Sequence, residues 1–208
     1  AKTPYTVHQW DADEVVLEKQ ARSITEALRG TPGIMLQKTG HGMTSPYLRG
    51  VTSQRTALYA DGVRVNNSFL REGPNQYWNL VDHYYYTNLQ VLMGPASVLY
   101  GSDAIGGVIL TRSTDLARGA AAGGSQWLGG DFVTRAASAE SSLSAHLRGS
   151  VAAGDKWTFG FGLTGQDFGE LESGDGEENP HTNYEQWSGN LRAKRWLSDN
   201  AWLLFGYD

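Results

Sequence analysis

The 208-residue sequence contains no cysteine, which excludes disulfide bonds and thiolate metal sites. No apolar run is long enough for a membrane-spanning helix, and the first residues lack the charged-then-apolar pattern of a signal peptide. A helical membrane protein is therefore excluded. A transmembrane β-barrel is not, because strands that alternate between lipid and lumen never produce a long hydrophobic run.

Motifs for catalysis and metal binding are also missing. The five histidines are scattered without an i, i+4 pair, no P-loop lysine follows the glycine-rich segments, and Gly-x-Ser-x-Gly is absent. The formal net charge of −5 gives no indication of nucleic-acid binding. We therefore expect no enzyme activity, no metal site, no cofactor and no nucleic-acid partner.

The acidic excess lies in the second half of the sequence. Much of it is one run without an intervening base: Asp167, Glu170, Glu172, Asp175, Glu177 and Glu178. Such a run is typical of a solvated loop, which we favour over a cation site.

The most informative segment is residues 88–109. Alternating residues predict a strand up to Met93, Gly94-Pro95 can open a short helix, and Gly101 can close it. Gly106-Gly107 then predicts a close backbone approach that leads into another strand. The unit is strand, short helix, glycine corner, strand.

Further short elements precede this unit. Ser23 to Glu26 fits a capping box, and strands are expected at 34–38 and 47–51. Asp61-Gly62 predicts a hairpin over residues 56–66, because both turn residues must adopt positive φ. Residues 1–115 are therefore expected to form a compact α+β domain with a short mixed sheet and short helices.

The second half, residues 116–208, predicts antiparallel strands. Apolar and small polar residues alternate with a period of two, and the expected strands are 127–138, 141–153, 156–167, 184–197 and 200–208. Short connections at 154–155 and 198–200 contrast with the long connection at 168–183, as at the two rims of an outer-membrane barrel. The aromatic girdles of such a barrel would suit Trp127, Trp157, Trp187, Trp196 and Trp202.

Five strands cannot close a barrel. Unpaired strand edges in hydrocarbon cost several kcal/mol per unsatisfied group, so we expect an incomplete barrel that forms the N-terminal part of a longer receptor.

The first half also carries several spaced motifs in order. They are Pro32-Gly33-Ile34, Tyr47-Leu48-Arg49-Gly50, Asp61-Gly62-Val63-Arg64-Val65-Asn66, Gly94-Pro95-Ala96-Ser97-Val98-Leu99-Tyr100-Gly101 and Ala104-Ile105-Gly106-Gly107-Val108-Ile109. Residues 5–115 thereby resemble the plug domain of TonB-dependent outer-membrane receptors, and the following strands resemble the start of the surrounding barrel.

This resemblance implies a location in the bacterial outer membrane, within outer-membrane lipid, with the plug gating a 22-stranded barrel. It implies a receptor that imports a scarce nutrient, with the periplasmic protein TonB and its inner-membrane energising complex as partners. The cargo would be a small molecule or an oligosaccharide, such as a siderophore or other iron chelate, haem, cobalamin or a glycan.

Two positions depart from the family pattern. The family commonly has a basic residue before Gly-Pro, which joins the Arg of the Arg-Gly motif in meeting barrel carboxylates, whereas this sequence has Met93. A TonB box is not evident in residues 4–16, so we expect it upstream of Ala1.

By resemblance, the loops after Lys38, Thr52 and Asn66 correspond to the outward apices of the plug. The expected ligand contacts are His41, Gln54, Arg55, Phe69, Arg71, Tyr77 and Trp78. Each of these could instead contact the barrel wall. Arg49 is expected to anchor the plug to the barrel through a charge-assisted bond.

Two other functions are weighed against import. A ligand-binding or signalling module of the envelope would report occupancy to a periplasmic partner without transport. A soluble all-β interaction protein would fold residues 120–208 in water, without detergent.

Overall fold

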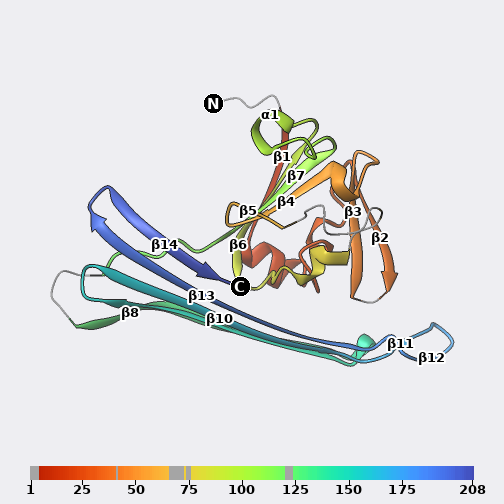
Figure 1. The fold of residues 1–208 in the computed structure, drawn as a ribbon. Coiled ribbons are helices and arrows are strands. Elements are labelled where there is room, and N and C mark those ends of the chain that lie inside the picture. The colour runs from red at the N-terminus through yellow and green to blue at the C-terminus, as the bar shows by residue number, and fades with distance from the viewer. Residues whose placement is uncertain (1–4, 41, 66–72, 74–75, 120–123) are drawn as a thin grey trace. The chain divides into compact units, whose positions relative to one another are not determined.

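The computed structural model describes residues 5–40, 42–65, 73, 76–119 and 124–208 (Figure 1). The chain divides into two compact units, an N-terminal unit (Ala1–Thr114) and a C-terminal unit (Asp115–Asp208). Among the described residues, no helix has the length and apolar character needed to cross a membrane.

The N-terminal unit contains a five-stranded mixed sheet of order β1-β6-β7-β4-β5 and a separate β2-β3 hairpin. Strand β4 pairs with β7 in parallel, and the other pairs are antiparallel. The strands are β1 Thr6–Asp11, β2 Ile34–Gly40, β3 Met43–Leu48, β4 Thr56–Ala60, β5 Val63–Arg64, β6 Tyr86–Met93 and β7 Gly107–Ser113. The short helices are η1 Glu14–Glu18, η2 Glu26–Leu28, η3 Ser53–Arg55, η4 Gln76–Leu80 and α1 Ser97–Tyr100.

The core of this unit lies between the mixed sheet and the short helices. Leu28 from η2, Leu58 from β4, and Val91 and Ile109 from the adjacent strands β6 and β7 are all at most 1% exposed. They belong to a single cluster of buried side chains. This core fixes the register of the strands whose ends form the loops described below.

Two local predictions for this unit are confirmed. Asp61 and Gly62 join β4 to β5 with φ values of +48° and +83°, as the hairpin requires. Gly101 ends α1 with φ +88°. The strand expected at residues 47–51 is shifted, because the chain turns at Arg49-Gly50 and β3 ends at Leu48.

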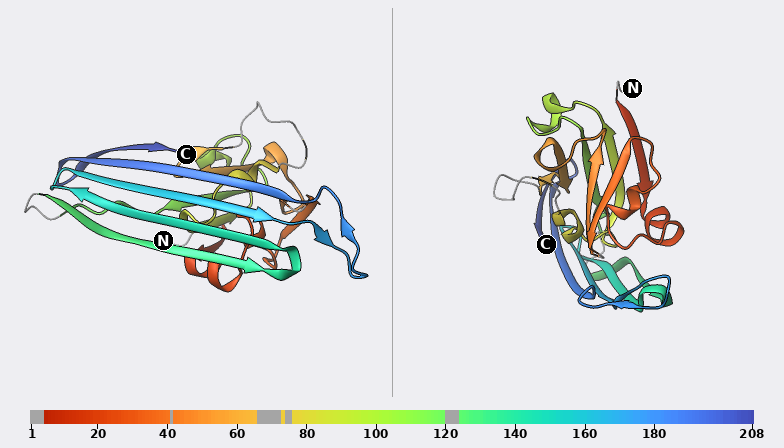
Figure 2. Two further views of the ribbon diagram at one scale, coloured as in Figure 1. Left: turned by 90° about the horizontal axis from the view of Figure 1, so that it is seen from below. Right: turned by 90° about the vertical axis from the view of Figure 1, so that its right-hand side faces the viewer.

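The C-terminal unit is one antiparallel sheet of five long strands in the order β14-β13-β10-β9-β8, which lie side by side in Figure 2. Its elements are β8 Ser125–Ala137, η5 Ser138–Glu140, β9 Ser142–Ala153, β10 Trp157–Phe168, β11 Leu171–Glu172, β12 Glu178–Asn179, β13 Tyr184–Ser198 and β14 Ala201–Tyr207. The long strands start and end within two residues of the predicted bounds. The acidic connection between β10 and β13 contains the small β11-β12 hairpin, which the sequence analysis did not predict.

This sheet is inverted relative to a soluble protein: its polar face is buried and its apolar face is exposed. Small and polar side chains are buried on one face: Ser144, His146, Thr158, Thr164, Gln166, Asn190, Arg192 and Lys194. Large apolar side chains are exposed on the other: Phe132, Leu143, Leu147, Phe159, Leu163, Trp187 and Leu191. A soluble sandwich would bury the apolar face. An outer-membrane barrel wall presents this face to lipid.

The predicted tryptophan girdle is only partly consistent with the structure. Trp127 and Trp187 are exposed with the apolar side chains, at 59% and 82%. Trp196 and Trp202 instead flank the ammonium of buried Lys194, at 4.4 and 4.6 Å from their ring centroids. Trp196 does not fit the predicted girdle, because it continues the alternation of Arg192 and Lys194 along β13 rather than that of Trp187. Its cross-strand partner Trp202 is 48% exposed but also contacts Lys194.

A charge on the exposed apolar face should destabilise the protein in a bilayer. Leu163 lies near the middle of β10 and is 60% exposed. We expect Leu163→Arg to cost about 2 kcal/mol or more, measured by denaturant unfolding in lipid vesicles. Leu163→Met is the matched control and should be nearly neutral. Equal stabilities for the two variants would argue against a lipid-facing role.

Candidate functional site

The candidate site is a corner of the N-terminal unit where the chain turns after β3. Arg49 and Gly50 adopt left-handed conformations, with φ +51° and +82°. Leu48 and Val51 exchange two backbone hydrogen bonds of 2.9 and 3.1 Å across the turn, and Arg49 N donates to Gly33 O at 2.9 Å. These bonds hold a non-glycine residue in an unfavourable backbone conformation, which fixes the position of its side chain.

The Arg49 guanidinium lies against Gly94. A Cβ atom on Gly94 would stand 3.1 Å from the Arg49 NH1 atom, and Gly94 has φ +110°. Gly94 N donates to Gly106 O at 2.9 Å, so this approach is fixed by the backbone on both sides. Arg49 is exposed, and among the residues that the structure describes no carboxylate pairs with it. Its charge is therefore accessible to an acidic group.

Gly106 and Gly107 close the other side of the corner. A Cβ atom on Gly106 would lie 2.1 Å from Val51 Cγ2, and one on Gly107 would lie 2.4 Å from Leu92 O. Gly106 N also donates to Arg55 O at 2.8 Å. The close backbone approach that the glycine pair predicted is confirmed, and it joins the segments around residues 49, 55, 94 and 106.

A pocket of about 300 Å³ opens at this corner. It is lined by Tyr47, Gly50, Val51, Thr52, Ser53, Gln54, Arg55 and Gly73. Gly73 N donates to Ser53 Oγ at 3.0 Å, which brings the segment after β5 to the rim. The pocket thus contains two of the predicted ligand contacts, Gln54 and Arg55.

A third predicted contact, Trp78, lies in the core of the N-terminal unit. Trp78 is only 1% exposed and belongs to the buried core cluster, so it is not the exposed loop aromatic that the sequence suggested. Its neighbour Asn79 donates to Gly42 O at 2.7 Å, in the turn between β2 and β3. That turn is separated from the Arg49 corner by the whole of β3, roughly 20 Å for six residues.

Four predicted contacts have no described side chain. His41, Phe69 and Arg71 lie outside the described residues, and the same holds for the side chain of Tyr77. Their ligand contacts stay predictions.

An ionic cluster forms around Glu26 and was not predicted from the sequence. Its Oε1 atom accepts from Arg22 NH2 at 2.6 Å, from Arg29 NH2 at 2.8 Å and from Lys38 Nζ. The Glu26 side chain is 8% exposed. Burial tends to raise the pKa of Glu26, but the hydrogen bonds and charges of Arg22 and Lys38 outweigh it and hold the pKa well below its usual range. The i, i+4 spacing of Arg22 and Glu26 was the available signal.

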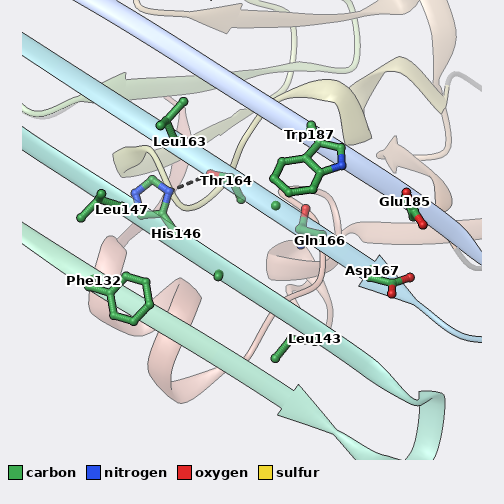
Figure 3. Close-up of a pocket in the computed structure, with 12 residues that line it drawn as sticks. Phe132, Leu143, His146, Leu147, Leu163, Thr164, Gln166, Asp167, Glu185 and Trp187 are labelled. Carbon is green, nitrogen blue, oxygen red and sulfur yellow. Dashed lines mark hydrogen bonds between the residues drawn. The ribbon is translucent and has the colours of Figure 1, made fainter.

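A second pocket belongs to the C-terminal unit (Figure 3). It has a volume of about 420 Å³ and is lined on the apolar face by Phe132, Leu143, Leu147, Leu163 and Trp187. Behind them His146 Nδ1 and Thr164 Oγ1 share a hydrogen bond of 2.7 Å. Most of its wall consists of exposed apolar side chains of the inverted sheet, so this pocket is a groove of that surface, with the carboxylates Asp167 and Glu185 also among its lining residues. No group of three or more potential metal ligands occurs in the described part of the chain.

Comparison with protein families supplies the decisive observation. Residues 1–108 match the family model of the TonB-dependent Receptor Plug Domain. The chain belongs to this family. The predicted fold class is confirmed, with an α+β plug domain followed by antiparallel strands of an outer-membrane β-barrel, and the protein is located in the outer membrane.

Curated relatives are similar to part of this chain. The vitamin B12 transporter BtuB of Photobacterium profundum is 36% identical over 91 residues, which cover 43% of this chain and 14% of the relative. The iron-regulated outer membrane virulence protein of Vibrio cholerae is 34% identical over 152 residues, covering 69% and 20%. The chain therefore spans only about a seventh to a fifth of the length of these relatives.

Solved structures show the same fold at low sequence identity. The copper transporter OprC superposes with a TM-score of 0.73 and 19% identity, over 93% of this chain and 28% of OprC. The pyoverdine receptor FpvA of Pseudomonas aeruginosa superposes with a TM-score of 0.73 and 17% identity, over 98% of this chain and 27% of FpvA.

Met93 precedes Gly94-Pro95, at the position where the resemblance implied a second basic residue. Its side chain is 3% exposed. A Cβ atom on Gly33 would lie 3.0 Å from Met93 Cε, so the methionine is packed under the corner. In the structure Met93 is a core residue, so the charges at the described part of this corner come from Arg49 and from Arg55 of the adjoining pocket.

Proposed function

We propose that the protein is an outer-membrane import receptor in which the plug domain gates the barrel and TonB supplies the coupling to cellular energy. One observation carries this proposal: a family plug domain is joined, in one chain, to strands whose apolar face is exposed and whose polar face is buried. A gated pore needs both parts. A soluble all-β interaction protein is not supported, because its apolar side chains would be buried.

The cargo is proposed as a class. The relatives are named for vitamin B12, for haem with hemopexin and for iron regulation. We propose a scarce nutrient of this kind, an iron chelate, haem, cobalamin or a glycan, taken up as an intact small molecule or oligosaccharide. Gln54 and Arg55 in the corner pocket remain proposed ligand contacts, together with His41, Phe69, Arg71 and Tyr77, whose side chains lie outside the described residues. Trp78 is not kept among them, because its side chain is buried in the core.

Growth experiments test this function directly. A strain that lacks the receptor carrying this sequence is compared with its parent on single sources of iron, haem, cobalamin or glycan. We expect the deletion to abolish growth on one limiting source, and deletion of TonB to have the same effect on that source. Growth on every source that matches the parent would contradict import, and growth that requires the receptor but not TonB would contradict the coupling.

Arg49 is proposed to anchor the plug domain to a carboxylate of the barrel. Arg49→Ala should then raise leakage through the receptor, because the plug loses a charge-assisted bond that can break under force. The measurement is sensitivity of cells to a large antibiotic that the intact outer membrane excludes.

The control for this substitution is Arg112→Ala. Arg112 is an exposed cation on β7 of the same unit, and its loss should leave leakage unchanged. Arg49→Lys should restore part of the barrier. If Arg49→Ala and Arg112→Ala leaked equally, the anchoring role would be excluded.

A further inference from the structure

Residues 115–118, which we call the anchor segment, open the C-terminal unit and contact its strands and turns through the bonds of Asp115, Ala117 and Arg118 and the packing of Leu116. Asp115 Oδ1 accepts from Lys194 Nζ of β13 at 2.6 Å. Ala117 O accepts from Thr158 Oγ1 of β10 at 2.8 Å. The segment thus makes one bond to each of two neighbouring strands before it reaches the turns.

The end of the anchor segment is bonded to two turns of the sheet. Arg118 Nε donates to Asp155 O at 2.8 Å, in the connection between β9 and β10. Arg118 NH1 pairs with Asp199 Oδ1 at 2.7 Å, in the connection between β13 and β14. One side chain therefore ties together two connections that are far apart in sequence.

The bond to Lys194 is difficult to replace. The Lys194 side chain is 2% exposed, and its ammonium lies between the rings of Trp196 and Trp202. Within the described residues Asp115 is the one carboxylate that pairs with it. Loss of the partner of a buried charge is strongly destabilising, so breaking the ion pair between Asp115 and Lys194 would cost free energy.

Leu116 adds an apolar contact that depends on a glycine. It is 7% exposed, and a Cβ atom on Gly160 of β10 would lie 2.8 Å from Leu116 Cδ2. Any side chain at Gly160 would occupy the position of the leucine. The missing side chain at Gly160 therefore leaves the space on β10 that Leu116 fills.

A single residue separates the anchor segment from the last bonds of the N-terminal unit. Ser113 N and Ser113 Oγ donate to the two carboxylate oxygens of Asp61 at 2.8 and 2.7 Å. Thr114 follows, is exposed, and makes no side-chain hydrogen bond to any residue in the described part of the chain. Asp115 then begins the anchor segment. Backbone freedom between the two sets of bonds is concentrated at Thr114.

We propose that the anchor segment stays bound to β10 and β13 throughout transport. Movement of the N-terminal unit then extends along the chain only as far as Thr114, which acts as the hinge. The proposal rests on the import function above. It implies that the plug domain is displaced or remodelled without the release of its C-terminal connection.

A reversible crosslink tests whether release is needed. The double variant Leu116→Cys/Gly160→Cys places two thiols within reach of a disulfide, and this sequence has no cysteine of its own. In the full receptor, with any further cysteine replaced by serine, uptake is measured with the single nutrient whose use required the receptor in the growth experiment above. We expect the oxidised form to import it at the same rate as the reduced form. Loss of uptake on oxidation, restored by reduction, would overturn the proposal.

A second experiment needs no cargo and so separates this proposal from the import function. Single variants Leu116→Cys and Thr114→Cys are labelled in energised cells with a hydrophilic maleimide. Local opening limits labelling of a buried thiol, so we expect Leu116→Cys to react at least about tenfold more slowly than the neighbouring exposed control. Addition of Asp115→Asn should remove most of that protection. Equal labelling of the two single variants would show that the segment detaches, whether or not any tested nutrient is imported.

Discussion

Replacement of Gly107 by alanine is expected to prevent stable folding of the N-terminal unit. The new Cβ atom would lie 2.4 Å from Leu92 O and 2.8 Å from Leu48 Cδ1. The first contact is with backbone, and β6 cannot move away without breaking its pairing with β7 at Met93–Gly107. We expect a loss of about 3 kcal/mol or more, at the upper end of the cost of overpacking.

Hydrogen exchange of the β6 and β7 amides in the full receptor measures this effect, because it reports local stability within a larger protein. Gly40→Ala is the matched control, since a Cβ atom there meets only Met43 at an ordinary 3.7 Å. Protection that is lost in Gly107→Ala and kept in Gly40→Ala is the expected result. Equal protection in both variants would show that the backbone around Gly107 accommodates the added methyl group.

Substitution of Glu26 by glutamine should have the second largest effect. The change keeps the shape of the side chain but leaves Arg22, Arg29 and Lys38 around a neutral amide, so three cations lose their shared partner. Removal of one member from a buried ionic group costs about 3 kcal/mol. Hydrogen exchange of the amides near η2 and β2 measures the loss.

The exposure of the three cations provides a control for this result. The Arg29 side chain is 63% exposed, against 19% for Arg22. Arg29→Gln should therefore cost much less than Glu26→Gln, because exposed ion pairs contribute little. A large effect of Arg29→Gln together with a small effect of Glu26→Gln would contradict the central role of the carboxylate.

The same carboxylate predicts a dependence on pH. The pKa of Glu26 is lower in the folded protein than in the unfolded chain, so its contribution to stability is complete above the ordinary glutamate pKa of about 4.3. As the pH falls below that value toward the lowered pKa, the contribution is lost. Glu26→Gln should remove this part of the acid sensitivity, and an unchanged acid profile would argue against it.

The barrel strands were predictable because their signal is local and repeated. Alternation with a period of two places the ends of β8, β9, β10, β13 and β14 within two residues of the structure. The Asp61-Gly62 turn and the Gly106-Gly107 approach were equally clear, because few other residues tolerate those backbone geometries.

Features that depend on contacts distant in sequence were not predictable. Glu26 and Lys38 meet only after β2 folds back toward η2, and Asp115 meets Lys194 across 79 positions. The burial of Trp78 depends on a core built from several strands. Likewise, the sequence placed Gln54 and Trp78 in one set of ligand contacts, whereas the length of β3 separates the places where they lie.

The two ends of the anchor segment should respond differently to dissolved salt. The pair between Arg118 and Asp199 has side-chain exposures of 35% and 91%, so mobile ions can screen it. In the other pair Asp115 is 87% exposed, but the Lys194 side chain is only 2% exposed and lies between two indole rings, and partly buried charges are screened less. In a concentrated saline medium we therefore expect the Arg118 end to loosen before the bond between Asp115 and Lys194 does.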